Sequence, residues 1–199
     1  SFEAEGKEYP MGYSLFEDDY QYEKKTEVRR KAFEVFSNEI KKYENTTASV
    51  YNAQCQKEKI ESEIRGYDSV FDFLLFPQNV TREMYDRQID TIMNELSPHM
   101  RRYARLKKKV LGLEEMTYPD LLVPLDSDYS PSVTWKECEE YAAEGLSIMG
   151  EDYVKMVHEA FEKRWFDYAR NQGKSTGGFC ASPYGKGSFI LLSWNGRMS

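Results

Sequence analysis

Histidine, cysteine and long apolar runs are all scarce in this sequence of 199 residues. The two histidines, His99 and His158, have no His or Cys partner at helical spacing, so they form no self-contained zinc site. The cysteines Cys55, Cys138 and Cys180 are odd in number and dispersed, which argues against a disulfide framework and favours a reducing compartment. No apolar run approaches the roughly 18 residues of a membrane helix, which excludes a transmembrane segment and a membrane partner.

A positive charge surplus and a secretory signal are missing as well. With 27 Lys and Arg against 34 Asp and Glu, the net charge is −7, which disfavours a general nucleic-acid binder. No basic stretch is followed by an apolar one near the start, so we expect a cytoplasmic protein. The chain starts at Ser1, as a processed chain or a piece of a longer one would. Without a signal, the sequons at Asn45 and Asn79 are coincidental: Thr47 is expected in a helix core and Thr81 at a helix cap.

Helical periodicity is what the sequence has in abundance. From Glu23 to about Glu63 neither glycine nor proline interrupts the chain, and apolar positions recur at spacings of three and four. We expect a long amphipathic helix that packs in a bundle, with a second helical stretch near 55–65. Its stripe consists of Phe33, Phe36, Ile40, Tyr43, Thr47 and Val50.

Further helices are predicted on either side of residues 113–133, which contain three prolines and are expected to form an extended linker. Before the linker, Tyr67–Phe76 reads as a short buried helix capped by Asp68, and Thr81 caps a helix over 81–111. In that second helix we expect a kink or a restart at Ser97-Pro98, a stop at Gly112, and an inner face of Tyr85, Ile89, Ile92, Leu96, Met100, Tyr103, Leu106 and Val110.

After the linker, Thr134 and Glu137 match a capping box that opens a helix to about Met149. Gly150 separates it from a helix near Glu151–Arg170, whose inner positions include Trp165 and Tyr168.

The two ends of the chain are less helical. Residues 1–23 are aperiodic and are expected to be extended or irregular. The last thirty residues hold six of the twelve glycines, and Gly178–Ala181 and Phe189–Ser193 are short segments of strand-like length. The sequence therefore predicts a mainly α protein, a helical bundle or lid with a small β hairpin or sheet at its C-terminal end.

Three features could carry chemistry, and each has a plainer interpretation. Cys180 is the one cysteine in a glycine-rich stretch, but a nucleophile needs a nearby histidine, so a small buried thiol is favoured. The cations between Arg101 and Lys109 could bind nucleic acid, but the solvated face of a helix is favoured. The glycines of Gly173–Gly187 lack the spacing of a phosphate loop; beside a strand they suit close backbone approach and pairing with an extended peptide.

One segment near the C-terminal end, RWFDYARNQGKSTGGFC at Arg164–Cys180, closely resembles the oligoendopeptidase F family of zinc metallopeptidases. The resemblance covers about 170 residues in the right order. Its elements are Arg164-Trp165, Asp167, Asn171-Gln172-Gly173-Lys174, Gly177-Gly178-Phe179, and Phe189–Leu192 with Trp194-Asn195-Gly196. Upstream, it extends over Arg29–Phe36, Arg65–Ser69, Phe76–Val80, Tyr103–Gly112 and Tyr118–Leu125.

The family's catalytic sequence, H-E-x-x-H on a helix with a further Glu downstream, is not present in residues 1–199. The resemblance implies that it begins shortly after Ser199. It thus implies a zinc-dependent oligoendopeptidase as parent, cut before its metal site, with no catalytic or metal-binding residue in this piece and no activity of its own. The partners would be short peptides and the missing C-terminal catalytic part.

By the same resemblance, residues 1–76 would be an N-terminal helical lid region, 77–125 a helical region, and 126–199 the start of the catalytic domain. The segment Gly177, Gly178, Phe179 and Cys180 would be the strand that binds the substrate backbone. The alternative from the sequence is a non-catalytic helical module that holds peptides or serves as a scaffold.

Overall fold

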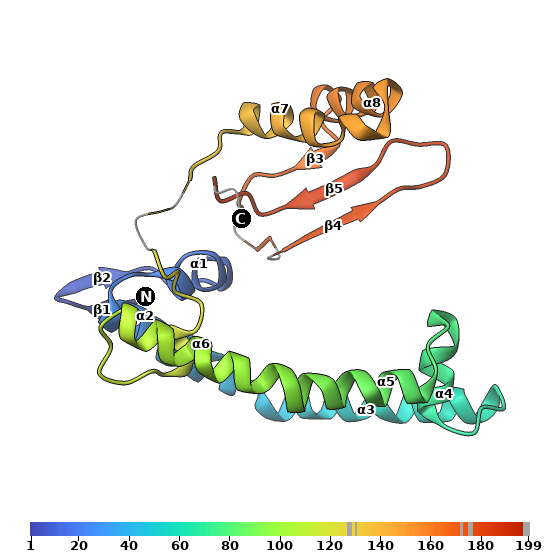
Figure 1. Ribbon diagram of the computed structural model, residues 1–199, viewed down its shortest axis with the longest axis horizontal. Coiled ribbons are helices and arrows are strands. Elements are labelled where there is room, and N and C mark those ends of the chain that lie inside the picture. Colours follow the sequence, from blue (N-terminus) through green and yellow to red (C-terminus); the bar gives the residue numbers. More distant parts are fainter. Residues whose placement is uncertain (127–128, 130, 172, 175–176, 197–199) are drawn as a thin grey trace. The chain divides into compact units, whose positions relative to one another are not determined.

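The computed structural model describes residues 1–126, 129, 131–171, 173–174 and 177–196. The fold is mainly helical with a small sheet near the C-terminal end, as predicted from the sequence (Figure 1). In chain order the elements are β1 (Phe2–Ala4), β2 (Lys7–Tyr9), α1 (Tyr13–Asp18), η1 (Tyr20–Tyr22), α2 (Thr26–Lys41), α3 (Glu44–Ile64), α4 (Val70–Leu75), η2 (Phe76–Gln78), α5 (Arg82–Thr91), η3 (Ile92–Leu96), α6 (Ser97–Val110), η4 (Tyr118–Asp120), α7 (Trp135–Gly145), η5 (Ser147–Met149), α8 (Glu151–Glu162), β3 (Phe166–Asp167), β4 (Gly178–Ala181) and β5 (Phe189–Leu192). Among these helices, none combines the length and the hydrophobicity needed to cross a membrane.

The chain divides into two compact units. Unit 1 combines Ser1–Ala32 with Leu122–Ser199, and unit 2 is Phe33–Leu121, so helix α2 belongs partly to each. The chain returns to unit 1 close to the boundary expected at 125, whereas the boundary expected at 76 falls inside unit 2. The division into a lid region, a helical region and the start of a catalytic domain stays a prediction.

Unit 1 begins with a β-hairpin, which agrees with the extended or irregular structure expected for residues 1–23, whereas the helices α1 and η1 in the same range were not expected. Strands β1 and β2 pair antiparallel with Phe2 opposite Tyr9, and the turn uses positive φ at Glu5 and Gly6. The ring of Phe2 stacks on Tyr9 at 5.3 Å and meets the edge of Tyr20 at 5.4 Å. The strands have three residues each, too few for an alternating pattern to stand out in the sequence.

After α1, η1 and the start of α2, the C-terminal part of unit 1 is a helix pair over a three-stranded sheet of order β3-β5-β4. Figure 1 shows α7 and α8 on one side of these strands. Strand β3 runs parallel to β5, and β4 runs antiparallel to it. Trp135, the first residue of α7, is the centre of the contact between helices and sheet. Its ring lies 4.0–5.7 Å from the rings of Phe161, Phe166, Tyr168 and Trp194.

Local signals in this part of the chain are mostly confirmed. Thr134 and Glu137 form the predicted capping box, and both predicted strands are present. The helix expected over 151–170 is wrong in its second half, because α8 ends at Glu162 and Arg164 takes a left-handed conformation with φ of 58°. Trp165 and Tyr168 therefore lie outside the helix, where Tyr168 stacks on Trp135. Because apolar residues at helical spacing continue beyond Glu162, the sequence pattern does not indicate where α8 ends.

Unit 2 consists of helices with short connections. The sequence predicts a long helix from Glu23 with a second helical stretch near 55–65. The structure has two helices, α2 and α3, but the break lies earlier, at Tyr43, which leaves helical geometry with φ of −101° and ψ of 9°. Asn45, Thr46 and Thr47, at the start of α3, have low helix propensity. A continuous helix is therefore less favourable here, and it can be interrupted although neither glycine nor proline is present. The predicted burial is also wrong for the second half of the stripe, where Thr47 is exposed and the exposed fractions of Tyr43 and Val50 are 60% and 65%.

The return path of unit 2 is a continuous rod formed by α5, η3 and α6, running in the opposite direction to α3 (Figure 1). Thr81 caps α5 as predicted, whereas Ser69 and not Asp68 caps α4. Ser97 is fully helical with φ of −55° and ψ of −41°, so it is not the cap of a new helix. The five residues of η3 widen into a π-helical turn, which is how the rod passes Pro98 without a break.

The segment after α6 is more ordered than the surface linker predicted for 113–133. Thr117 and Asp120 form a capping box around η4, and Asp120 is fully buried. Lys107 is also buried, and its ammonium donates a hydrogen bond to the carbonyl oxygen of Leu121. The expectation that all cations of α6 lie on a solvated face is therefore wrong for Lys107. Part of the predicted linker, residues 127, 128 and 130, lies outside the described residues.

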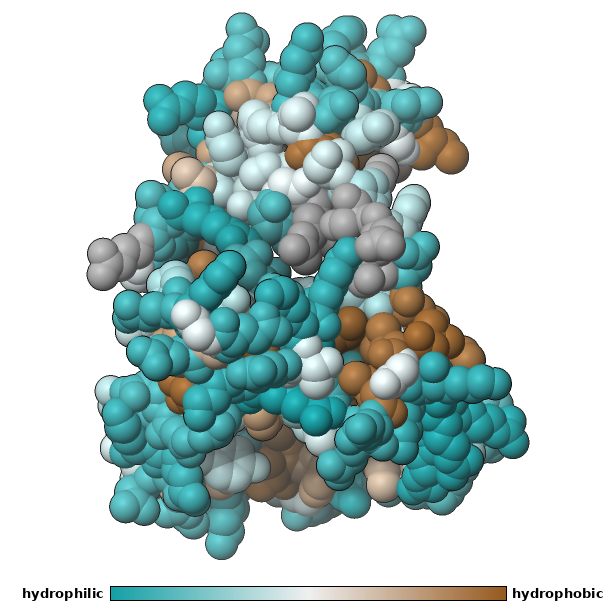
Figure 2. Space-filling view, turned by 90° about the vertical axis from the view of Figure 1, so that its left-hand side faces the viewer, coloured by the Kyte–Doolittle hydropathy of each residue, from teal (hydrophilic) through white to brown (hydrophobic). Residues whose placement is uncertain are grey.

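Hydrophilic side chains cover most of the face shown in Figure 2, with hydrophobic ones gathered in a few places. This agrees with a mean hydropathy of −0.73. In unit 2, however, the apolar stripe of the rod is only half covered. Its exposed fractions lie between 42% and 54% at Ile89, Ile92, Leu96, Met100, Tyr103, Leu106 and Val110.

Candidate functional site

The histidines do not form a metal centre in the described part of the chain. His99 belongs to unit 2 and His158 to unit 1. His158 Nδ1 lies 2.8 Å from Oε1 of Glu139, an exposed contact between α8 and α7. Within the same residues, no group of three or more His, Cys, Asp or Glu side chains is placed to hold a metal ion.

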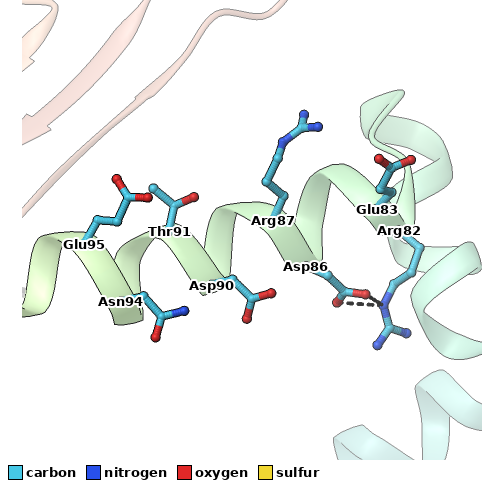
Figure 3. A pocket seen from close by; sticks show the side chains of 8 residues that line it. All are labelled: Arg82, Glu83, Asp86, Arg87, Asp90, Thr91, Asn94 and Glu95. Carbon is cyan, nitrogen blue, oxygen red and sulfur yellow. Dashed lines mark hydrogen bonds and ion pairs between the residues drawn. The ribbon is translucent and has the colours of Figure 1, made fainter.

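One surface hollow lies along α5 and η3 in unit 2. It is lined by Arg82, Glu83, Asp86, Arg87, Asp90, Thr91, Asn94 and Glu95. Figure 3 shows these side chains leaving the helix on two opposite sides, so they do not converge on a common point. The contact drawn there is an exposed ion pair of 2.9 Å between Arg82 and Asp86, one helical turn apart. This surface offers charge but no enclosed binding site.

The predicted substrate strand lies at an edge of the unit 1 sheet. Strand β4 pairs with β5 through Gly178↔Leu192 and Phe179↔Leu191, and the sheet order places β4 outermost. All four residues of β4 are exposed, with 58% of Phe179 accessible. An edge strand of this kind presents backbone N–H and C=O groups that another extended chain can pair with.

Glycines shape this edge at two close approaches. A Cβ on Gly178 would lie 2.9 Å from the carbonyl oxygen of Leu191, so β4 can pair this closely with β5 only through glycine. A Cβ on Gly187, in the connection between the two strands, would lie 2.7 Å from the ring of Trp165. The connection is closed by a hydrogen bond of 2.8 Å between the hydroxyls of Ser182 and Ser188.

A second hollow, of about 580 Å³, lies against this sheet. It is lined by Arg164, Trp165, Phe166, Asp167, Phe179, Phe189, Ile190 and Leu191. Register and alternation place Phe179, Leu191 and Phe189 on one face of the sheet. The opposite face carries Phe166, whose ring contacts Phe161 of α8 at 4.7 Å. The apolar side chains beside the edge strand therefore point away from the helix pair.

A buried lysine, Lys174, pairs with Asp167, which lines the hollow. Lys174 has only 7% of its side chain exposed, and its ammonium donates to Oδ1 of Asp167 at 3.0 Å. It also donates to the carbonyl oxygens of Asp167 and Ala169 at 2.9 and 2.7 Å. Three acceptors satisfy the buried cation, so Lys174 holds the chain beyond β3 in place. Gln172, from the same resemblance segment, lies outside the described residues.

The cysteines differ in accessibility. Cys180 is exposed, with Sγ 3.6 Å from the hydroxyl of Ser182, so the prediction of a buried thiol is wrong. Cys55 is exposed on α3, whereas burial raises the pKa of the partly covered Cys138 thiol. Among the described residues neither histidine contacts Cys180, so a Cys180 nucleophile has no geometric support.

The structure keeps the four predicted strand residues together and adds a neighbouring set that sequence reasoning missed. Gly177 takes φ of 76° where the strand begins, and Gly178, Phe179 and Cys180 follow in extended conformation. The sequence does not predict the hollow lined by Trp165 and Leu191, because the apolar spacing places Trp165 in a helix. Phe189–Leu192 is apolar at all four positions, so the sequence offers no alternation that would identify the uncovered sheet face.

Comparison with known proteins gives one family. Residues 20–198 match the family model described as Peptidase family M3. The chain is 33% identical to oligopeptidase PepF of Bacillus subtilis over 87% of its own length and 26% of that protein. It is 32% identical to the chromosomal oligoendopeptidase F of Lactococcus lactis subsp. cremoris, over 86% of its own length and 28% of that protein.

Solved structures share the fold. A crystal structure of Pz peptidase A with an inhibitor matches 93% of this chain and 34% of its own, with a TM-score of 0.79 and 14% identity. The oligoendopeptidase F of Enterococcus faecium matches 81% of this chain and 30% of its own, with a TM-score of 0.58 and 22% identity. The chain thus spans between a quarter and about a third of the length of these relatives.

Proposed function

This chain belongs to peptidase family M3, and from that premise we propose that it is part of a zinc-dependent oligoendopeptidase that hydrolyses short peptides. The names of its relatives, oligopeptidase and oligoendopeptidase F, support the activity and the class of substrate. On this proposal, residues 1–199 supply cleft walls and a substrate strand in a cytoplasmic enzyme, and are inactive alone. The catalytic part outside these residues would be the principal partner.

The residues at hand do not fit a zinc site. The two histidines lie in different units, and His158 is engaged with Glu139. Three or four convergent ligands are the minimum for zinc, and no such group occurs among the described residues. The metal of the proposed enzyme would have to be held by residues outside 1–199, and this chain's role is to bind and orient the peptide.

The exposed edge of β4 is the observation that carries the proposal. A peptide added beside Gly178–Ala181 would extend the sheet through main-chain hydrogen bonds, which need no particular side chains. Alternate side chains of such a peptide would project toward the face of Phe179 and Leu191, where the hollow lies. The backbone would supply affinity, and the hollow would favour peptides with an apolar side chain at one position.

Two exposed cysteines allow a direct test of this strand. Cys180 lies on β4 and Cys55 lies on α3, so the same reagent can report on both. We expect a short peptide, added to the full-length protein in the presence of a chelator that prevents cleavage, to slow alkylation of Cys180 several-fold. Alkylation of Cys55, measured on the same sample by peptide mass spectrometry, should not change.

Equal rates at Cys180 with and without peptide would remove the role of β4 but leave the peptidase proposal intact. The peptidase proposal has its own test, the hydrolysis of an internally quenched peptide by the full-length protein with and without the chelator. Binding without hydrolysis would favour the alternative of a non-catalytic peptide-holding module.

A further inference from the structure

Helix α6 has a dense cluster of positively charged side chains. Helix α6 contains six cations and no carboxylate: Arg101, Arg102, Arg105, Lys107, Lys108 and Lys109. Lys107 is buried against the Leu121 carbonyl, and the other five are exposed. A local surplus of this size in a chain of net charge −7 calls for an explanation.

The five exposed cations share one side of the helix. Arg101, Arg105 and Lys108 follow spacings of four and three, and Arg102 and Lys109 flank that line. At about 100° per residue they fall within roughly a third of the helix circumference, and they extend over about 12 Å along its axis. We call these five residues the α6 basic face.

Neither ion pairing nor the helix dipole accounts for the α6 basic face. Within the residues that the structure describes, none of the five forms an ion pair or a side-chain hydrogen bond. The negative end of the helix favours cations in its last turn, which covers Lys108 and Lys109. Arg101, Arg102 and Arg105 lie earlier, where the dipole contributes little.

Carboxylates on both sides limit the length of any anion on this face. Glu95 precedes Arg101 by six residues, about 9 Å along the rod, and Asp90 lies one to two turns further back. Beyond the other end, Glu114 and Glu115 follow the stop at Gly112 and are exposed. A long polyanion such as nucleic acid would meet these carboxylates, whereas an extended peptide covers 12 Å with about four residues.

We propose that the α6 basic face binds short peptides with clustered Asp or Glu side chains, and that it biases the enzyme toward such substrates. The choice of a peptide over other short anions rests on the proposed function. Five unpaired cations attract carboxylates over the distance at which charges act in solution, about 8 Å at physiological salt. The expected consequences are faster capture and tighter binding at low salt.

The test measures binding and needs no hydrolysis. A hexapeptide of glutamate with a neutral dye is titrated against the full-length protein in the presence of a chelator, and anisotropy is recorded between 50 and 300 mM salt. The variant carries Arg101→Gln, Arg105→Gln and Lys108→Gln. The matched control carries Lys41→Gln, Lys57→Gln and Lys59→Gln, which remove the same charge from exposed positions elsewhere in unit 2.

We expect the variant to bind the acidic peptide about tenfold more weakly than the unmodified protein at 50 mM salt, and the control to differ by less than twofold. A hexapeptide of glutamine should show no such difference. Glutamine preserves helix propensity, and unchanged circular dichroism verifies the fold of both variants.

Three outcomes would overturn the proposal. One is equal affinity of the variant and the unmodified protein for the acidic peptide. Another is tighter binding of a twenty-nucleotide single strand than of the peptide, which would indicate a nucleic-acid surface. The third is a dimer in sedimentation that the variant abolishes, which would assign the face to a second copy. Hydrolysis of neutral peptides is independent of all three, so this proposal can fail while the peptidase proposal stands.

Discussion

The two units are stabilised by different kinds of residue. All but one of the buried apolar side chains among the described residues belong to unit 1, and the exception is Leu75. Unit 2 buries mainly polar residues, namely Ser62, Lys107 and Asp120, whereas Arg29 is the corresponding buried polar residue of unit 1. Unit 1 also has the aromatic cluster around Trp135, whereas the rod of unit 2 leaves a half-exposed apolar stripe.

This difference shows that an amphipathic pattern and a packed core are separate properties. Spacings of three and four predict which residues share a helix face, and they do so equally well in both units. Whether that face is covered depends on what packs against it, and the pattern does not contain that information. A two-layer helical unit has little interior, so a few buried polar contacts become more important for its stability.

The largest effect is expected where unit 2 depends on a buried cation. Lys107→Met removes the hydrogen bond to the Leu121 carbonyl and should lower the free energy of unfolding by about 2–3 kcal/mol. Lys108→Met, one residue away and exposed, is the control and should change it by less than about 0.5 kcal/mol. Urea denaturation followed by circular dichroism measures both, and hydrogen exchange of α6 amides locates the loss. Equal effects of the two substitutions would contradict a special role for Lys107.

A matched pair of valines compares the two units directly. Val28 in α2 is fully buried in unit 1, and Val50 in α3 is 65% exposed in unit 2. Because both lie in helices, replacement by alanine changes helix propensity equally and leaves burial as the difference. Val28→Ala should lower the free energy of unfolding by about 1.5 kcal/mol. Val50→Ala should leave it unchanged or raise it slightly.

Thermal and urea unfolding of the two valine variants decide the comparison. A cost at Val50 as large as at Val28 would mean that the stripe of unit 2 is covered in solution. That result would identify a partner surface for α3, such as another part of a longer protein.

The sequence predicted the elements better than their surroundings. Caps at Thr81 and Thr134 were predictable because side-chain capping is local, and Gly112 ends its helix for the same reason. The end of α8 was not predictable, since Trp165 and Tyr168 continue the helical spacing while the tertiary contact with Trp135 takes Tyr168 elsewhere.

The candidate site at β4 could be predicted only in part, because the adjacent hollow depends on tertiary contacts that the sequence pattern does not contain. Glycines near Phe179 indicated a strand with a close neighbour, and Gly178 has one in Leu191. The left-handed Arg164 belongs to a local C-cap, in which the backbone N–H of Trp165 donates to the carbonyl oxygen of Ala160. The hollow also needs β3 parallel to β5, and that pairing depends on residues distant in sequence. The burial of Lys107 could not be predicted, because in sequence it does not differ from the exposed lysines next to it.

The smallest expected effect is a difference in pH dependence between the helix cap at Thr134 in unit 1 and the helix cap at Thr81 in unit 2. Hydrogen bonds from the backbone N–H and the hydroxyl of Thr134 lower the pKa of the Glu137 carboxyl below its ordinary value of 4.5. The ionised form is the one that is stabilised, so this contribution is complete above about pH 4.5 and is lost as the pH falls through the depressed pKa. At the Thr81 cap of unit 2 the third helical position is Met84, which does not titrate.

We therefore expect the cost of Thr134→Ala to shrink between pH 6 and pH 3, while the cost of Thr81→Ala, about 1 kcal/mol, stays constant. Urea midpoints at the two pH values measure both differences, and Glu137→Gln should make the cost of Thr134→Ala independent of pH. Parallel pH profiles for the two threonine variants would contradict the role of the Glu137 carboxylate. They would mean that the capping box of unit 1 contributes no more than the simple cap of unit 2, and that the two units differ in their interiors but not at their helix ends.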